Sequence, residues 1–385
     1  MDTVFSQQPN TIFDTMSGLA RDLGAINLGQ GFPDQDGPED IRAKAAEFLM
    51  SGPNQYPPMR GLPELRTAIA EHYGRFQDLA LDPMTETLVT SGATESLAAA
   101  ILGLVAPDDG VILIQPLYDA YLPLVLKAGG APTFVRQTPP DWRITKEALE
   151  AALTPKTRFL ILNNPQNPTA RVFTRDELQV IADFCVRHGI IAISDEVWEH
   201  VVFDGRTHVS LLSLPGMREC CVKIGSAGKM FSLTGWKVGL ICAEPKLLEA
   251  VAKAHQFLTF TTAPNLQRAV AYGLGQDAAY FQKMQNQFAR GRDRLAAGLE
   301  TIGFATLPSE GTYFLAVDLA RSNIGMQDAE FSFRLVREFG VASIPFSSFY
   351  AVDPVTNVVR LCFSKNDATL DEALERLAKA KTAFA

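Results

Sequence analysis

The chain has few cysteines, and none of them lies in a pattern that binds metal or cycles between thiol and disulfide. Five cysteines are scattered through 385 residues, and no two of them form a C-x-x-C motif. The spacing therefore supports neither a zinc site nor a redox pair. We expect buried, reduced thiols, as is usual for a protein of the cytoplasm.

Features of membrane, secreted and nucleic-acid-binding proteins are also missing. No apolar run reaches the ~18 residues of a membrane span, and the opening segment MDTVFSQQPNTIFDTMSG has no apolar core of a secretory signal. The formal charge of −8 argues against non-specific binding of nucleic acid. Repeats and low-complexity linkers are absent too. We predict a cytoplasmic globular protein, which at ~150 residues per domain has two or three domains.

Short apolar runs alternate with amphipathic stretches through the middle of the chain. The runs are apolar on both faces, which is typical of strands that helices cover on either side. One amphipathic stretch begins at Thr174, has Glu177 three residues on as in a capping box, and ends at Gly189. This alternation predicts an α/β fold with a mostly parallel sheet flanked by helices. The predicted strands are 87–90, 111–114, 158–162, 190–194, 222–225 and 239–243.

The pattern changes toward the C-terminal end. Helices are expected over about 284–302 and 368–382, and the N-terminal segment is expected to pack beside this part. We therefore predict a large domain, 46–285, and a smaller α+β domain formed by 1–45 and 286–385. Between the two helices lie three short strand candidates, GTYFLAVDL (311–319), GVASIP (340–345) and VVRLCFS (358–364).

Polar and reactive groups directly follow five of the predicted strands. In an open α/β sheet, ligands bind beyond the carboxyl ends of the strands. The five ends offer backbone donors at the start of a helix, an aromatic ring, an amide, a carboxylate and an amine. This set suits one cofactor, pyridoxal phosphate. The residues are Gly92, Ala93 and Thr94, then Tyr118, Asn167, Asp195 and Lys229.

The phosphate, aldehyde and ring nitrogen of this cofactor each match a group in the sequence. The phosphate needs N–H donors at a helix N-terminus, a hydroxyl and a cation, which residues 92–94, Ser226 and Lys237 can supply. The aldehyde needs the amine of Lys229. The ring nitrogen needs a carboxylate partner, Asp195, to stay protonated.

Two further strand ends suit the ring of the same cofactor. The aromatic side chain of Tyr118 can cover the ring face, and the amide of Asn167 can donate a hydrogen bond to the 3-oxygen. The five histidines are expected to have structural or surface roles, and no metal site is predicted.

The segments around these residues resemble the class I aminotransferases of PLP fold type I. SAGKMFSLTGWKVG (226–239) is similar to the family's lysine signature, NNPQNPTARVF (163–173) to its Asn-Pro motif, and SDEVWEHVVFDG (194–205) to its Asp motif. AINLGQGFPDQDGPEDI (25–41) and PNQYPPMRG (53–61) resemble one branch of the family. That branch contains kynurenine, glutamine, methionine and N-succinyldiaminopimelate aminotransferases. The resemblance covers nearly the whole chain.

The resemblance implies an enzyme that moves an amino group from an L-amino acid to a 2-oxo acid. Arg360 matches the arginine that binds the substrate α-carboxylate through two hydrogen bonds, and Gly31 and Asn167 match groups that complete this contact. Tyr56 matches a tyrosine that reaches the cofactor phosphate of the neighbouring subunit, which implies a homodimer with shared active sites. Phe13 lies where the branch carries an aromatic residue on the substrate side.

Two positions depart from the family pattern. Trp198 stands where a tyrosine hydroxyl usually contacts the cofactor 3-oxygen, and an indole N–H can donate but cannot accept or ionise. We expect Trp198 to border the cofactor and to tune it differently. Thr261 and Thr262 replace the Phe-His pair of kynurenine aminotransferases, which weakens the case for a large aromatic substrate. Methionine, glutamine, aromatic amino acids and succinyl-diaminopimelate all remain open as donors.

Two other functions fit parts of the same pattern. A C–S β-lyase uses the same cofactor to cleave cysteine conjugates, releasing pyruvate and ammonia without an oxo acid. A transcription regulator with an aminotransferase-like sensor domain carries a DNA-binding domain before it. About 20 residues precede the recognisable segment here, so we do not expect the regulator. Transamination is the function we expect, and the β-lyase reaction remains the alternative.

Overall fold

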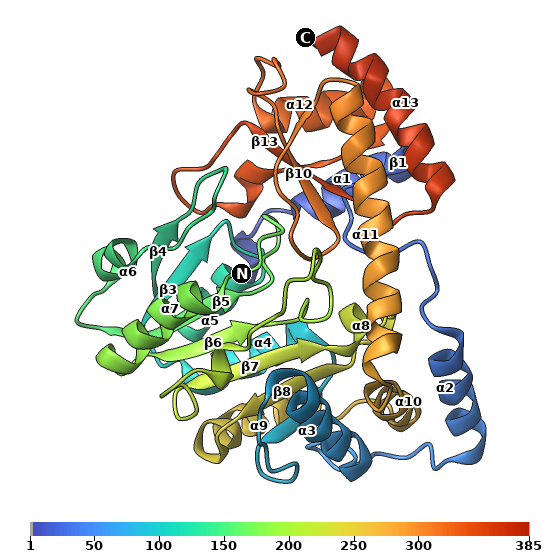
Figure 1. Ribbon diagram of the computed structural model, residues 1–385. Coiled ribbons are helices and arrows are strands. Elements are labelled where there is room, and N and C mark those ends of the chain that lie inside the picture. Colours follow the sequence, from blue (N-terminus) through green and yellow to red (C-terminus); the bar gives the residue numbers. More distant parts are fainter. Residues whose placement is uncertain (1–2, 385) are drawn as a thin grey trace.

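A seven-stranded sheet forms the centre of the larger part of the molecule (Figure 1). The structure is a computed structural model that describes residues 3–384. Strand β8 is antiparallel to both of its neighbours, and all other neighbouring strands in this sheet are parallel. The prediction of a mostly parallel α/β sheet is confirmed. In spatial order the strands are β2 (Thr87–Thr90), β8 (Gly239–Ala243), β7 (Cys221–Ser226), β6 (Ile191–Asp195), β5 (Thr157–Asn163), β3 (Gly110–Gln115) and β4 (Ala131–Arg136).

Helices cover both faces of this sheet, which is why its strands are apolar on both sides. In β3, Val111 and Leu113 belong to one buried cluster, while Ile112 and Ile114 belong to the other. The first cluster includes side chains of α4 (Ala93–Leu104), α5 (Tyr121–Ala128) and α9 (Pro245–Leu258). The second includes side chains of α3 (Pro63–Gln77), α6 (Lys146–Ala152), α7 (Arg175–His188) and α10 (Pro264–Leu274).

Six of the seven strands match the predicted runs to within one residue at either end. The exception is β4, for which no strand was predicted. It lies at the edge of the sheet, where most of its side chains are only partly buried. Its sequence APTFVR mixes apolar residues with proline, threonine and arginine, so it contains no continuous apolar run.

Helix α7 begins and ends where the sequence indicates. The Thr174 hydroxyl accepts from the backbone N–H of Glu177, and the Glu177 carboxylate accepts from that of Thr174, so the capping box is formed. Gly189 follows the helix with φ 62°, a left-handed conformation that glycine adopts without strain. These signals were sufficient because they depend only on neighbouring residues.

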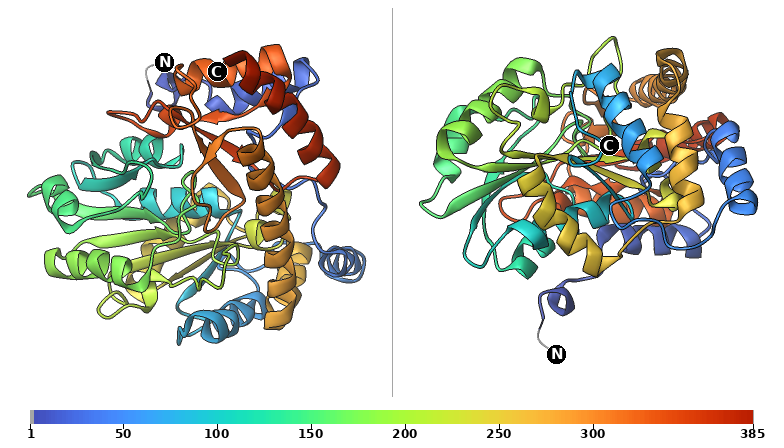
Figure 2. Two further views of the ribbon diagram at one scale, coloured as in Figure 1. Left: turned by 45° about the horizontal axis from the view of Figure 1, so that its top comes forward. Right: turned by 90° about the horizontal axis from the view of Figure 1, so that it is seen from below.

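A four-stranded antiparallel sheet forms the core of the smaller part. Helices α11 and α13 lie side by side against it (Figure 2). Of the expected helices, α11 begins about one and a half turns earlier than predicted, where Asp277 caps it, and α13 agrees to within two residues. The strands are β12 (Ile344–Pro345), β13 (Val358–Cys362), β10 (Phe314–Asp318) and β9 (Ala305–Thr306), and the helices are α11 (Ala278–Thr301), α12 (Asp328–Arg334) and α13 (Asp367–Phe384).

The N-terminal segment joins this smaller part, as expected. Helix α1 (Ile12–Asp22) packs there, and β1 (Ile26–Asn27) pairs in parallel with β11 (Val341–Ala342). Helix α2 (Glu39–Ser51) instead contacts α10 at the other end of the molecule. The predicted domain boundaries, at 45 and 285, fall inside α2 and α11, and the division into two domains stays a prediction.

The remaining elements are short turns of helix. Among the described residues, no helix combines the length and the apolar character that a membrane span needs. The short elements are α8 (Ala227–Met230), four 3₁₀ turns at Phe5–Gln7, Leu211–Ser213, Thr234–Trp236 and Phe346–Phe349, and a π-helical turn at Leu335–Phe339.

Candidate active site

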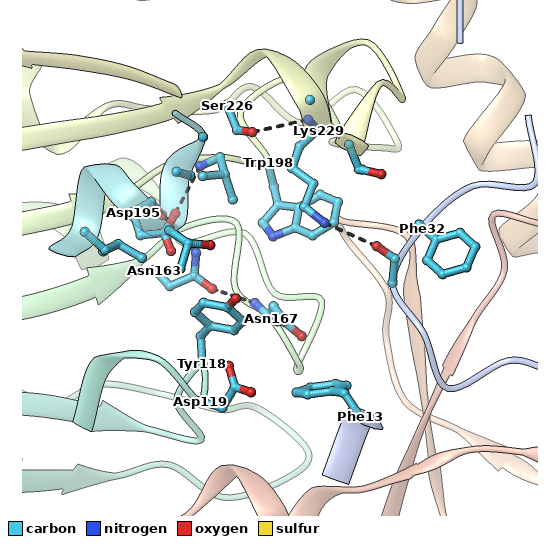
Figure 3. Close-up of a pocket in the computed structure, with 18 of the residues that line it drawn as sticks. Phe13, Phe32, Tyr118, Asp119, Asn163, Asn167, Asp195, Trp198, Ser226 and Lys229 are labelled. Atoms are coloured by element: carbon cyan, nitrogen blue, oxygen red, sulfur yellow. Dashed lines mark hydrogen bonds between the residues drawn. The ribbon is translucent and has the colours of Figure 1, made fainter. Parts of the chain in front are cut away.

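One cavity of about 550 Å³ collects nearly all of the predicted site residues (Figure 3). It lies between the carboxyl ends of the strands of the large sheet and strands β10 and β13 of the small one. Tyr56 is the one predicted site residue outside it. The predicted residues that line the cavity are Phe13, Gly31, Gly92, Ala93, Thr94, Tyr118, Asn167, Asp195, Trp198, Ser226, Lys229, Lys237 and Arg360.

Lys229 projects into the cavity from α8, the single turn that follows β7. The Ser226 hydroxyl caps this turn by accepting from the backbone N–H of Lys229 at 3.4 Å. The Lys229 Nζ donates to the carbonyl oxygen of Gly31 and to the hydroxyl of Tyr313, both at 3.2 Å. Burial lowers the pKa of Lys229 to about 8. A substantial fraction of the amine is therefore neutral and nucleophilic near neutral pH.

Asp195 ends β6 with a carboxylate that is only 4% exposed. The hydroxyl of Tyr121 donates to its Oδ2 at 2.5 Å, and the side chain of Asn163 donates to its backbone carbonyl at 2.9 Å. Burial raises the pKa of Asp195 to about 6, although the hydrogen bond from Tyr121 acts in the opposite direction. A cationic group in the cavity beside this carboxylate stabilises its charged form.

The start of α4 forms an anion site with Lys237. Gly92 precedes the helix with φ 84°. Because glycine has no side chain, it does not cap the first turn, and the N–H groups there are free of a side-chain cap. A Cβ atom on Gly92 would lie 3.0 Å from Cε and 3.3 Å from Nζ of Lys237. The ammonium group therefore lies close to the helix N-terminus, and a glycine is needed there. Both groups attract the same kind of ligand, a phosphate or another compact anion.

Arg360 lies on β13 with its guanidinium group almost completely buried. It donates to the side-chain oxygen of Asn167 at 2.7 Å and to the backbone carbonyl of Gly29 at 2.6 Å, and the ring of Phe314 lies 3.9 Å from it. Its Nε atom is buried and has no hydrogen-bond partner among residues 3–384. Burial lowers the pKa of Arg360 to about 10. A buried cation with an unused donor, facing a cavity, favours binding of a carboxylate.

Aromatic residues surround these charged groups. Trp198 is buried, and the centre of its ring lies 4.7 Å from Nζ of Lys229. Tyr118 is partly buried, and burial raises the pKa of its hydroxyl to about 12. The ring of Phe13 lies 5.1 Å from the guanidinium group of Arg360. Trp198 thus lies beside the amine of Lys229, and Phe13 lies beside the guanidinium group of Arg360. These are the cofactor side and the substrate side on which we expected the two residues.

Tyr56 and the two threonines lie away from these groups. The side chain of Tyr56 is 85% exposed and contacts the ring of Phe260 edge to face. Thr262 is buried and shares a hydrogen bond with Ser91 at 3.0 Å, whereas Thr261 is partly buried beside Phe260. Within the described residues of one chain, neither threonine lines the cavity.

Several residues of the site were not predicted from the sequence. Tyr121 and Asn163 hold Asp195, Tyr313 holds Lys229, and Gly29 holds Arg360. Gly31 was expected at the substrate carboxylate, and its contact with Lys229 was not predicted. Tyr121 had a weak signal, since it follows Tyr118 by three residues at the start of a helix. The contacts of Tyr313 and Gly29 join segments about 280 or more residues apart, and no local pattern predicts them.

The large sheet and the cavity above it define the fold of the type I pyridoxal phosphate enzymes, and solved structures of such enzymes are similar to this chain. The structure of N-succinyldiaminopimelate aminotransferase from Mycobacterium tuberculosis matches with a TM-score of 0.95 at 44% identity, over 99% of this chain and 100% of that one. The structure of an Escherichia coli protein with a methionine aminotransferase function matches with a TM-score of 0.95 at 39% identity, over 98% of this chain and 99% of that one.

Sequence comparison gives the family. The model for aminotransferase class I and II matches residues 24–377. A probable N-succinyldiaminopimelate aminotransferase of Mycobacterium tuberculosis is 44% identical over 95% of both chains, and the methionine aminotransferase of Escherichia coli is 40% identical over 96% of both. The chain belongs to the class I and II aminotransferases, and it is an aminotransferase of the branch expected from its motifs.

Proposed function

We propose that this aminotransferase binds pyridoxal phosphate in the cavity and uses Arg360 to hold the α-carboxylate of an L-amino acid. The observation that carries the proposal is the arrangement of four groups in one cavity. Lys229 lies between the carboxylate of Asp195, the anion site at Gly92 and Lys237, and the guanidinium group of Arg360. These are the groups that the aldehyde, ring nitrogen and phosphate of the cofactor and the carboxylate of the substrate each require.

The residues fit the cofactor by two structural criteria. The N-terminus of α4 and Lys237 form a cradle that a Cβ on Gly92 would fill. The carboxylate of Asp195 is buried, and its raised pKa means that it gains from a cationic partner such as a protonated ring nitrogen. When bound, pyridoxal phosphate supplies an aldehyde that bonds to amines and a protonated ring that withdraws electrons from the substrate Cα.

The side chains of the protein supply binding and proton transfer. Arg360, oriented by Asn167 and Gly29, fixes the substrate carboxylate and so orients the Cα–H bond. The amine of Lys229, when it is not bonded to the cofactor, would act as the base that takes the proton from the substrate Cα and as the acid that returns one. Asp195 keeps the ring nitrogen protonated throughout. The net reaction is a ping-pong exchange, in which one amino acid becomes a 2-oxo acid and a second oxo acid is aminated.

The names of its relatives suggest the range of donors. They act on N-succinyldiaminopimelate, methionine and kynurenine, and we propose that the donor of this chain is one of these amino acids or a close analogue. The experiment is to mix the purified protein and cofactor with each amino acid separately and to follow the absorbance change from the aldehyde to the amine form of the cofactor.

The proposal expects one or a few amino acids to convert the cofactor fully and a 2-oxo acid to restore it. Conversion by none of them would overturn the proposal. Release of pyruvate and ammonia from a cysteine conjugate, without an added oxo acid, would assign the chain to the β-lyase reaction instead.

We also propose a homodimer in which Tyr56 contributes to the neighbouring active site. Tyr56 is exposed and contacts the ring of Phe260, which is also exposed. Solvent exposure of such a group is unfavourable, and a second copy of the chain would bury it. In the test, inactive Lys229→Ala and weakened Tyr56→Ala chains are mixed and allowed to exchange. Shared sites predict that activity rises above that of either variant alone, and independent sites predict no rise.

A further inference from the structure

Two oxygen atoms from opposite ends of the chain hold the amine of Lys229. Its Nζ donates to the carbonyl of Gly31 and to the hydroxyl of Tyr313, each at 3.2 Å. The Tyr313 hydroxyl in turn donates to the same Gly31 carbonyl at 2.7 Å. Amine, hydroxyl and carbonyl thus form a closed triangle, in which the hydroxyl accepts from one group and donates to the other.

The two oxygens are fixed in place independently of the lysine. Tyr313 is completely buried, with the ring of Trp198 edge to face against it at 4.4 Å. Burial raises the pKa of Tyr313 well above its ordinary value, so its hydroxyl stays protonated and continues to donate to Gly31. A Cβ on Gly31 would lie 2.6 Å from the ring of Phe314, so only glycine allows this close approach.

No other side-chain oxygen performs this role in the part of the chain that the structure describes. Tyr313 alone has a side-chain oxygen within hydrogen-bonding distance of Nζ. Trp198, whose ring centre lies 4.7 Å from the amine, has no oxygen to accept a hydrogen bond. The orientation of the free amine therefore depends on Tyr313 and Gly31.

We propose that Tyr313 is a positioning residue: with the Gly31 carbonyl it forms a docking point for the Lys229 amine during the steps in which the lysine is not bonded to the cofactor. The proposal rests on the proposed function, since a substrate amine that takes the place of the lysine on the cofactor releases the Lys229 amine in each cycle. Tyr313 itself transfers no proton. Its hydroxyl keeps the amine at one place beside the substrate Cα, and because it accepts a hydrogen bond it stabilises the protonated amine against the effect of burial.

The test uses the holoenzyme in its amine form, which excess donor amino acid produces and which leaves Lys229 free. After removal of small molecules, Lys229 is labelled with an amine-reactive reagent at a series of pH values, and its peptide is quantified by mass spectrometry. Since only the neutral amine reacts, the midpoint of the labelling rate reports its protonation. Wild type should have a midpoint near 8.

Tyr313→Phe keeps the buried ring and removes only the hydroxyl. Its midpoint should lie about 1 pH unit below that of wild type, so that labelling at pH 7 becomes roughly fivefold faster. The turnover number kcat should fall by about tenfold with KM for the donor nearly unchanged, because Arg360 still binds the carboxylate. The matched control is Tyr350→Phe, whose hydroxyl donates to the Gln137 carbonyl at 2.8 Å, away from Lys229. It should keep the wild-type midpoint.

A wild-type midpoint in Tyr313→Phe would overturn the proposal. If that variant does not fold, a crystal structure of the wild-type amine form decides the question. Nζ within hydrogen-bonding distance of both Tyr313 and Gly31 supports the docking point, and Nζ turned away from them overturns it. Failure of every amino acid to produce the amine form is a different result, which overturns the proposed function and this inference with it.

Discussion

Replacing Arg360 by lysine tests the proposed carboxylate site most directly. A guanidinium group has five N–H donors in one plane, and here two of them are used on Asn167 and Gly29. Three donors remain on this side chain, which lines the cavity where a substrate carboxylate would bind. A lysine ammonium has three donors, so after the same two contacts only one is left for the substrate.

The variant thus loses one charge-assisted hydrogen bond to the carboxylate. Such a bond contributes about 1.5–3 kcal/mol, and about 1.4 kcal/mol corresponds to a factor of ten in rate. We expect Arg360→Lys to lower kcat/KM for the donor by roughly 10- to 150-fold. The conversion of the cofactor to its amine form gives this constant in single-turnover experiments.

A substrate without the carboxylate separates this effect from a general disturbance of the site. For the amine that corresponds to the donor but lacks the α-carboxylate, wild type and Arg360→Lys should react at nearly equal rates. Arg334→Lys, at an exposed arginine on α12, serves as the control for the substitution itself. Equal losses for the amino acid and the amine would refute the assignment of Arg360.

Three further predictions concern buried side chains that can ionise. Lys229→Ala should abolish turnover while the thermal unfolding temperature stays within a few degrees of wild type, and full activity in that variant would exclude Lys229 as the reactive amine. Burial lowers the pKa of His72 to about 4, so the unfolded chain binds more protons than the folded one between about pH 6.5 and 4. His72 should therefore contribute about 2 kcal/mol to the fall in the free energy of unfolding by urea from pH 7 to pH 5, and the fall should be clearly smaller in His72→Gln. Lys223→Met removes the ammonium group that lies 2.8 and 2.6 Å from the buried carboxylates of Glu196 and Glu199. It should lower the free energy of unfolding by about 3–5 kcal/mol, and a loss under about 1 kcal/mol would contradict this account.

Most of the large sheet and of the cofactor site was predictable because its signals are local. Each strand that is covered on both faces is a continuous apolar run, and the residue after the run then lies at the carboxyl edge of the sheet. That rule placed Asp195 and Lys229 at one edge of the sheet, and the resemblance to the family's motifs gave them their expected roles. The edge strand β4 was missed for the same reason, since half-exposed residues need no apolar run.

The contacts that orient these groups were not predictable, because they join distant segments. Gly29 was not expected to hold Arg360, since a backbone carbonyl leaves no trace in the residue type. Tyr313 lies within the strand candidate 311–319, and nothing in that run marks its hydroxyl as a partner of Lys229. The role of Tyr56 stays a prediction, because it concerns a contact with another chain.

The hydrogen bonds of Gly29 and Gly31 have a consequence for biosynthesis. Their carbonyls leave the ribosome among the first residues, yet their partners Tyr313 and Arg360 are made when most of the chain is already complete. A nascent chain has the sheet, the lysine and the phosphate cradle long before it has the substrate arginine. A truncated product that ends before β13 is therefore expected to retain the cofactor-binding elements without the means to select a substrate.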